Sequence, residues 1–392
     1  MAFIFPAIAL ATFGLALFLR RLLRKPGHLT TASPNQDVPI LGLRDDYRLA
    51  DASVRLLSGF TVGQVRALGS FPDYAKLSGV PLPSAVSASF RIEDAAPRPY
   101  RPLRWPYHQT MALQKLDPDY WLELESTYRS RIRQRQDLHA QHGSDILNSL
   151  PGSELAQREL MEMALQFLCA RYPQYFELRG QTFVNRLLAT EHHLDRVSPL
   201  KVLLDNVPED FAIMMRDERT GRYVLRAGVI CSTIGWHIGQ KMGMGLSEIH
   251  GEVPDFEEKL SLSVDRFFNR LPADSPVSRG SWSLETGSPL FLPPTDPNLQ
   301  LRKSQDAKLR IEDVTLRVDW QTLRRLPLSS AVVFNFKALF TPLPRLRHEP
   351  YVPALLLRIL EGGKDSLMAY KGSWHVEHLV RPVLGGVGEG AG

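Results

Sequence analysis

The apolar residues of this chain recur with helical spacing in some segments and with strand spacing in others. Within residues 153–171, Leu160, Ala164 and Leu168 are four positions apart, and Phe167 falls beside them. This spacing places the four side chains on one face of a helix, and Pro173 ends it. The pattern therefore predicts an amphipathic helix over 153–171.

Two later segments have strand spacing. Residues 210–233 contain two apolar stretches separated by a turn at 218–221, where Gly221 can take the positive φ that such turns need. In 329–343, Phe334 and Phe336 would share one face, with polar residues on the other. The two segments predict an antiparallel hairpin and a half-buried strand.

Helices are expected on both sides of these strands, so the predicted fold class is α+β, an antiparallel sheet with flanking helices. A helix over 256–271 would turn Leu260, Val264, Phe267 and Phe268 inward. Another would begin near Asp117 and carry Trp121, Leu124 and Tyr128, while 49–57 and 62–68 are short helical candidates and the Pro-rich stretch 284–308 is an expected exposed loop.

The first residues differ sharply from the rest. Ala2 to Leu19 is an uncharged, almost wholly apolar run, followed by Arg20, Arg21, Arg24 and Lys25. As a helix it would span roughly 27 Å, close to the ~30 Å core of a bilayer. A secretory signal peptide, the alternative, would carry basic residues before the run and a small-residue cleavage site after it. We expect one uncleaved transmembrane helix with a cytosolic body, in the endoplasmic reticulum first of all.

Composition indicates a globular body, since 44% of the 392 residues are hydrophobic and 23% are charged. The net charge of +5 lies mostly in the N-terminal flank, and without a basic stripe interleaved with aromatics we expect no nucleic-acid binding. Cys169 and Cys231 match no zinc or redox spacing. The expected organisation is an anchor and basic flank (1–25), a linker and partly ordered approach (26–97), one domain (98–384) and a Gly-rich disordered tail (385–392).

Several segments, in order, carry a resemblance to a known family. They are RPYRPLRWPYHQTMALQKLD, WLELESTY, LCARYP, AGVICSTIGW, QKMGMGLSEIHGEVPDFEEKL, SVDRFFNRLP, VDWQTLRRLPLSSAVVFNFKALFTPL and YKGSWHVEH. Together they resemble the haem-dependent oxidative N-demethylase alpha subunits, and especially the uncharacterised fungal members. Each segment is a weak signal alone, but their shared order is specific.

The resemblance implies a PAS-like fold that holds haem b. It implies a monooxygenase-like oxidoreductase that oxidises an N-methyl group of a small amine and releases formaldehyde. Electrons would arrive from a separate flavin or iron–sulfur reductase, in keeping with the lack of a nucleotide-binding fingerprint in this sequence. The alternatives are a haem-binding sensor without turnover and a scaffold that keeps only the fold.

Haem iron needs an axial donor, commonly a histidine nitrogen. His250, in SEIHGEVPDF, is the favoured ligand because Gly251 and Pro254 would present it from a rigid turn, and His108 is the second candidate. Without the family, a solvated or merely hydrogen-bonded His250 would be the more ordinary reading. The remaining histidines are disfavoured by their positions, namely His237, the adjacent His192 and His193, and the C-terminal His375 and His378.

Haem propionates would call for arginine, whose guanidinium pairs with carboxylates at two points. Arg279 and Arg324 are the candidates, and Arg325 cannot share a pocket with Arg324 if the segment is extended. Trp236 is expected to line the cofactor site, and Trp282 and Trp320 are further candidates for contact with a methylammonium group. Relatives tend to carry Arg-Asn where this chain has Arg279 and Gly280, which removes an amide from the expected substrate contacts.

Overall fold

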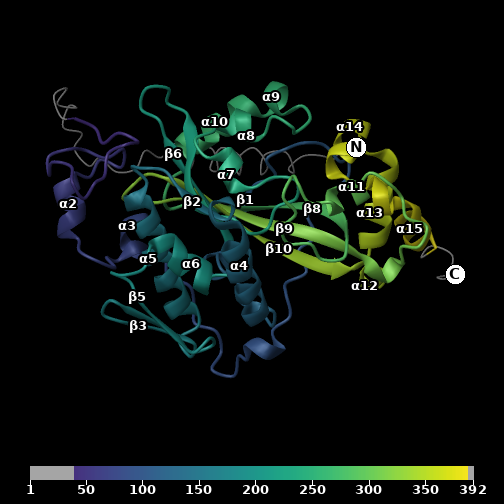
Figure 1. The fold of residues 1–392 in the computed structure, drawn as a ribbon, viewed down its shortest axis with the longest axis horizontal. Helices are drawn as coiled ribbons and strands as arrows, with labels where there is room; N and C mark the ends of the chain where they lie inside the picture. The colour runs from purple at the N-terminus through teal and green to yellow at the C-terminus, as the bar shows by residue number, and fades with distance from the viewer. Residues whose placement is uncertain (1–38, 387–392) are drawn as a thin grey trace, which may run out of the picture. The chain divides into compact units, whose positions relative to one another are not determined.

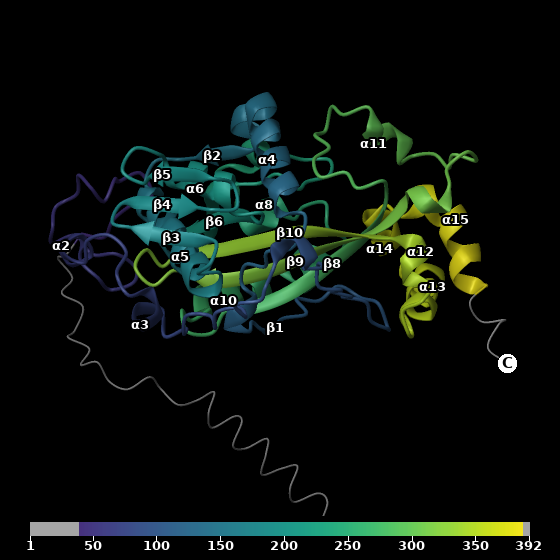
Figure 2. The ribbon, with the colours of Figure 1, turned by 90° about the horizontal axis from the view of Figure 1, so that it is seen from below.

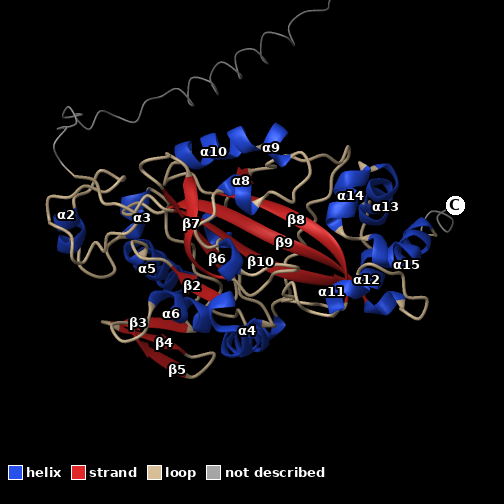
Figure 3. Cartoon of the chain, turned by 45° about the horizontal axis from the view of Figure 1, so that its top comes forward, coloured by secondary structure: helices blue, strands red, loops and turns tan. Residues whose placement is uncertain are grey.

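A seven-stranded antiparallel sheet forms the centre of the fold (Figure 3). The computed structural model describes residues 39–386, and the described chain from Ile40 onward forms one compact unit. The strand order is β1-β8-β9-β10-β6-β7-β2. These strands are β1 (Gln114–Lys115), β2 (Leu147–Ser149), β6 (Asp210–Arg216), β7 (Tyr223–Val229), β8 (Val277–Thr286), β9 (Val314–Arg325) and β10 (Val332–Pro342). The α+β class predicted from the sequence is confirmed.

One face of the sheet packs against the largest apolar cluster, which includes Val333 of β10. The elements on this side are α2 (Val62–Ala67), α3 (Tyr74–Ser78), α4 (Tyr128–His142), α5 (Glu154–Arg171), α6 (Pro199–Asn206) and a small sheet of β3 (Phe176–Arg179), β4 (Thr182–Asn185) and β5 (Thr190–His193). Residues 40–97 belong to this side, because Val62 and Tyr74 are buried in the cluster.

The opposite face is covered by short helices. These are α7 (Ile238–Lys241), α8 (Leu246–Ile249), α9 (Phe256–Lys259) and α10 (Ser261–Arg270). Figure 1 shows α8 to α10 above the sheet, with α4 to α6 on its other side. Val332 and Phe336 of β10 pack into the second apolar cluster beneath these helices. Because both faces of β10 are covered, successive residues of this strand are buried.

A third apolar cluster lies at one end of the long strands, where β8 and β9 meet the C-terminal helices (Figure 2). The helices are α12 (Leu343–Leu346), α13 (Val352–Gly362), α14 (Asp365–Lys371) and α15 (Trp374–Gly385), and α11 (Asn298–Leu301) lies in the loop before β9. Trp282 and Val318 of the sheet pack against Leu356 and Val380 of the helices. This end of the sheet brings α14 beside β8.

Three local predictions are confirmed. The helix α5 runs to Arg171, as the apolar spacing requires. The strands β6 and β7 form a hairpin whose turn holds Gly221 at φ 67°. In β10, Phe334 and Phe336 face the second cluster. The alternation of side chains depends only on local periodicity, so the sequence predicts it without tertiary information.

Other local predictions need correction. The helix expected near Asp117 is only a 3-10 turn at Pro118–Tyr120, and α4 begins at Tyr128. Trp121 and Leu124 are buried outside any regular helix, because the irregular segment after the 3-10 turn passes between packed elements. Similarly, 49–57 forms turns, since Asp51 accepts a hydrogen bond from the Ser53 backbone and competes with helix formation.

Two expected elements are present in altered form. The helix over 256–271 is divided at Leu260 into α9 and α10, although its expected inward residues do pack into the second cluster. The stretch 284–308 is not wholly an exposed loop, because β8 continues to Thr286 and Leu290 and Phe291 are buried.

The predicted localisation is also corrected. Within residues 39–386, no helix is long and apolar enough to cross a membrane, so the structure does not support a single-pass membrane protein. The expected anchor, Ala2 to Leu19, lies outside the described residues, as does most of the predicted tail.

Candidate functional site

His250 ends the short helix α8, and its ring is held in a defined orientation. The Nδ1 atom lies 2.7 Å from the carbonyl oxygen of Leu246, and the ring stacks on Phe256 with 4.5 Å between centroids. A carbonyl only accepts, so Nδ1 carries the proton and donates. The neutral ring therefore presents an unprotonated Nε2, for which the structure shows no hydrogen-bond partner among residues 39–386. This is the arrangement in which histidine binds a metal ion.

The surroundings of His250 favour this neutral form. Burial lowers the pKa of His250, and the positive charges of Lys241 and Arg279 lower it further, while the hydrogen bond to Leu246 opposes them. Lys241 lies 4.3 Å from the centre of the Trp236 ring and donates to the carbonyl of Ile249 at 3.0 Å. Trp236 is thereby placed beside the segment that carries His250.

Arg279 lies on β8 and is the second predicted residue in this region. The strand β1 pairs with β8 only at Val277 and Ser278, so β8 is an edge strand from Arg279 onward. Burial and the charge of Arg104 lower the pKa of Arg279. The structure shows no hydrogen bond or ion pair from Arg279 to any residue in 39–386, and its Nε atom is buried. Arg279 is half-buried, and a partly desolvated cation without an anion is unfavourable, so this position is suited to an acidic ligand.

Two further cations lie beside Arg279, and the three are called the basic cluster: Arg104, Arg279 and Lys371. Lys371, the last residue of α14, donates to Ser281 Oγ at 3.0 Å and to the Trp282 carbonyl at 2.8 Å. Burial lowers the pKa of Lys371 to about 8; Asp319 opposes this shift, and the two arginines add to it.

Arg104 donates to the carbonyl of His108 at 2.8 Å, and its Nε is a buried donor without a partner among the described residues. It forms no ion pair within that part of the chain. The basic cluster therefore presents more positive charge than Asp319 alone can balance.

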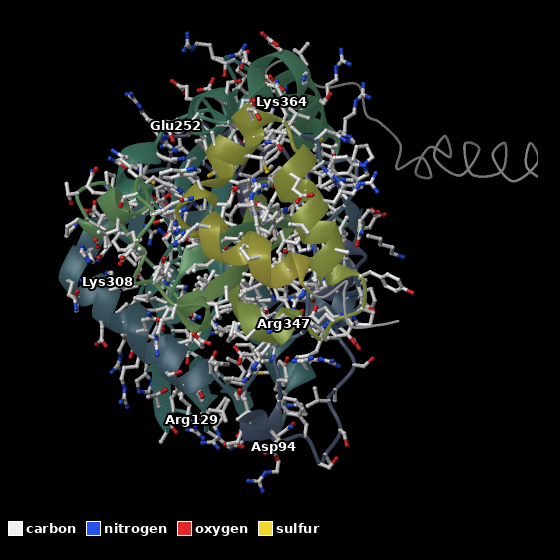
Figure 4. The ribbon with its side chains drawn as sticks, turned by 90° about the vertical axis from the view of Figure 1, so that its right-hand side faces the viewer. Asp94, Arg129, Glu252, Lys308, Arg347 and Lys364 are labelled. Atoms are coloured by element: carbon white, nitrogen blue, oxygen red, sulfur yellow. The ribbon has the colours of Figure 1, made fainter. Side chains whose placement is uncertain are left out.

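The segment with His250 is connected to the helix that carries Lys371. Asp255, at the start of α9, pairs with Lys364 before α14 at 2.7 Å. Burial raises the pKa of Tyr370, and the charges of Glu252 and Arg279 also act on it, so this tyrosine lies within electrostatic range of the loop after α8 and of β8. Figure 4 labels Glu252 and Lys364 at the upper end of the face formed by the C-terminal helices. The loop 250–255, β8 and α14 thus border one site.

The other predicted residues do not join this group. His108 is exposed, with Nδ1 3.1 Å from the carbonyl of Pro106. Arg324 lies on the opposite face of the sheet from Arg279, since Gln321 is paired with Arg279 and side chains alternate. Its guanidinium lies 3.9 Å from the Trp121 ring, in the large apolar cluster. Arg325 instead donates to the Tyr223 hydroxyl, so the two arginines do point apart.

The remaining candidates have separate structural contacts. His237 pairs with Asp145 at 3.0 Å, and His375 lies 2.8 Å from the carbonyl of Gly372. Trp320 stacks on Tyr100 with 3.7 Å between centroids, on the face away from Arg279. Trp282 does contact the site, because Lys371 lies 5.3 Å from the centre of its ring.

Sequence reasoning missed Arg104 and Lys371. Both fall within segments that carry the family resemblance, RPYRPLRWPYHQTM and YKGSWHVEH, but no local pattern marks either as a site residue. A half-buried lysine on a helix end and an arginine in a Pro-rich stretch look like ordinary surface residues. Only the tertiary structure shows that both lie within electrostatic range of Arg279.

The residues present fit haem. His250 offers a neutral imidazole nitrogen, the second apolar cluster offers a dry surface with Phe334 and Trp236 at its border, and the basic cluster offers unpaired charge for two propionates. Among residues 39–386, there is no group of three His, Cys, Asp or Glu side chains that would hold a metal ion by themselves. A porphyrin-held iron needs only the one histidine.

Comparison with known families agrees with this chemistry. The family described as haem-dependent oxidative N-demethylase, alpha subunit-like, matches residues 112–381, more than half of the chain. The matched range includes His250, Arg279 and Lys371, and Arg104 lies before it. The chain therefore belongs to the family of haem-dependent oxidative N-demethylase alpha-subunit-like enzymes.

Proposed function

We propose that this chain binds haem b through Nε2 of His250 and holds the propionates with Arg279, Arg104 and Lys371. The observation that carries the proposal is Arg279, a cation without an anionic partner in the described chain, close enough to His250 to lower its pKa. The sheet with α8 to α10 on one face would then serve as the PAS-like holder of the cofactor. Trp236 would border the ring plane beside Lys241.

We propose that the reaction is the oxidative removal of an N-methyl group from a small amine. When bound, haem supplies the oxidising chemistry: a methylamine, O₂, two electrons and two protons give the demethylated amine, formaldehyde and water. The chain's own residues orient the cofactor, exclude water and keep the His250 ring neutral. Electrons are supplied by a separate flavin or iron–sulfur reductase, a partner class that the missing nucleotide fingerprint favours.

The visible absorption spectrum of the purified full chain, reconstituted with haemin, tests the cofactor proposal. His250→Ala should lose the Soret band of the bound, histidine-ligated state, because the imidazole that would bind the iron is removed. His108→Ala is the matched control and should keep it, since His108 is exposed. Retention of an unchanged spectrum in His250→Ala would contradict the assignment.

Gly280 favours one alternative function, a haem-binding sensor without turnover. A Cβ atom at this position would lie 2.7 Å from the Pro102 Cβ, so the close approach of Pro102 excludes a larger side chain such as asparagine. The amide expected from relatives is therefore absent. Formaldehyde release from dimethylamine with a surrogate electron donor separates the two: release supports the enzyme, and haem binding without release supports the sensor.

A further inference from the structure

A hollow lies on the face of the sheet opposite to Arg279, where Trp320 of β9 and Lys337 of β10 point. Including the part open to solvent, its volume is about 430 Å³. Its border is formed by aromatic and acidic side chains from the segment before α4, together with the start of β6: Tyr100, Tyr120, Trp121, Glu123, Glu125 and Glu209. The cofactor proposal uses none of these residues.

The charges of this hollow do not balance. Glu123 lies 3.6 Å from Arg98, and Glu125 lies 3.3 Å from Lys337, so two carboxylates each have one cation. Glu209 is 3% exposed and has no ion pair within residues 39–386. Its Oε1 accepts the backbone N–H of Glu123 at 3.0 Å, whereas Oε2 has no partner among those residues. When Glu209 is ionised, the most buried of the three carboxylates therefore has no counter-charge among those residues.

The aromatic side chains indicate which kind of cation fits. The Arg98 guanidinium lies 3.6 Å from the centre of the Tyr120 ring, at the more exposed side of the hollow. Here a delocalised cation of the chain itself is held by one ring and one carboxylate, so the chemistry of this lining suits an organic cation. An inorganic ion would need several oxygen ligands, and no group of three metal-ligating side chains occurs in the described chain.

We propose that this hollow is a binding site for one small protonated alkylamine, whose N–H group donates to Oε2 of Glu209 and whose alkyl part contacts the aromatic side chains. A single positive charge would complete the pairing of the three carboxylates. The Oε2 acceptor favours an ammonium that bears N–H over a quaternary one. The site is independent of haem, because it lies on the other face of the sheet.

Binding should depend on pH through Glu209. Burial raises the pKa of Glu209 to about 7. The positive charge of Lys337 opposes this rise, and the negative charge of Glu123 adds to it. The other titratable groups within electrostatic range are Glu125, Arg98, Tyr128 and Arg135 of α4, and Tyr172 after α5. A bound cation stabilises the ionised form of Glu209, so its binding releases a proton from this side chain at and below pH 7. The affinity for the cation therefore falls as the pH is lowered.

Isothermal titration of the full chain with methylammonium chloride, at constant ionic strength, tests the site. We expect saturable binding of one equivalent, roughly tenfold or more weakened by Glu209→Gln, which removes the charge with little change of shape. Glu191→Gln, at an exposed position on β5, is the matched control and should bind as the unmodified chain does. In His250→Ala, binding should persist, which separates this site from the cofactor site.

Three results would overturn the proposal. The first is that Glu209→Gln and the unmodified chain bind methylammonium with equal affinity and have the same unfolding midpoint. The second is equal binding of potassium chloride and methylammonium chloride, because a simple counter-ion effect does not involve the aromatic rings. Loss of binding only in His250→Ala would assign the amine to the cofactor site instead.

Discussion

At the scale of single residues, the orientation of the His250 ring decides its chemistry. Among the other candidate ligands, a ring nitrogen close to a protein oxygen is also found in His108, His193, His237, His375 and His378. His375 shares the Nδ1–carbonyl contact and a pKa lowered by burial, whereas His250 combines these two features with Arg279 of the basic cluster within electrostatic range. No single feature would be sufficient to identify a ligand.

Lys371 gives a prediction about pH. Its pKa is lowered to about 8 without a ligand, and bound propionates would raise it. Haem binding therefore takes up a proton above pH 8, so haem affinity is highest below pH 8 and falls as the pH rises from about 8 toward 10. Titration of the full chain with haemin from pH 7 to pH 10 measures this.

The control for this titration is Lys371→Met, which keeps the length of the side chain and removes the charge. Its haem affinity at pH 7 should be lower than that of the unmodified chain. Its pH dependence over the same range should be largely lost. An unchanged pH profile in this variant would show that Lys371 does not contact the acidic groups of the ligand.

At the scale of elements, β8 holds the site together through its neighbours. Its edge is approached by segment 98–108 on one side and by α14 on the other, through Pro102 and Lys371. The local sequence pattern predicts neither contact, because the segment that packs against a strand edge depends on the path of the whole chain. The position of Arg104 depends on this packing.

Gly280→Ala tests the packing of β8 against segment 98–108. The new Cβ would lie 2.7 Å from the Pro102 Cβ and 2.9 Å from its Cγ, so the segment must shift. We expect a loss of about 1–3 kcal/mol in the free energy of unfolding, as for other overpacked sites. Urea unfolding measures it. Thr286→Ala, at an exposed position at the end of the same strand, is the control, and an equal effect of both substitutions would contradict the steric explanation.

At the scale of the whole molecule, the N-terminal part of the described chain is integral to the core. Tyr74 donates to Glu162 of α5 at 2.7 Å, and Val62 and Val65 are buried with α5 in the large cluster. Segments before and after residue 98 thus pack together within one compact unit.

A chain that starts at residue 98 should therefore be less stable than one that starts at residue 39. Removing 39–97 exposes the apolar surface of α5 and leaves Glu162 without the Tyr74 hydroxyl. At about 1.5–3 kcal/mol per buried apolar side chain, the loss would be a large share of the stability of a domain. Comparing the urea midpoints of the two chains tests this. Equal midpoints would support an independent domain from residue 98.

Some features of this protein were determined by the sequence itself. The helix α5, the β6–β7 hairpin and the alternation in β10 follow from local periodicity, which depends only on neighbouring residues. Ordered motifs were enough to indicate the family. Burial without regular structure is not predicted in this way, as at Trp121, because apolar residues in a buried irregular segment can have helical spacing.

Only the tertiary structure decided how the site is assembled. His250, Arg279 and Lys371 come from a loop, a strand edge and a helix end, and Arg104 comes from a segment far before them. It also decided that Arg324 faces the other side of the sheet, with Trp121. The physical reason is that electrostatic contacts form between residues that are distant along the chain, and local periodicity carries no information about which distant segments meet.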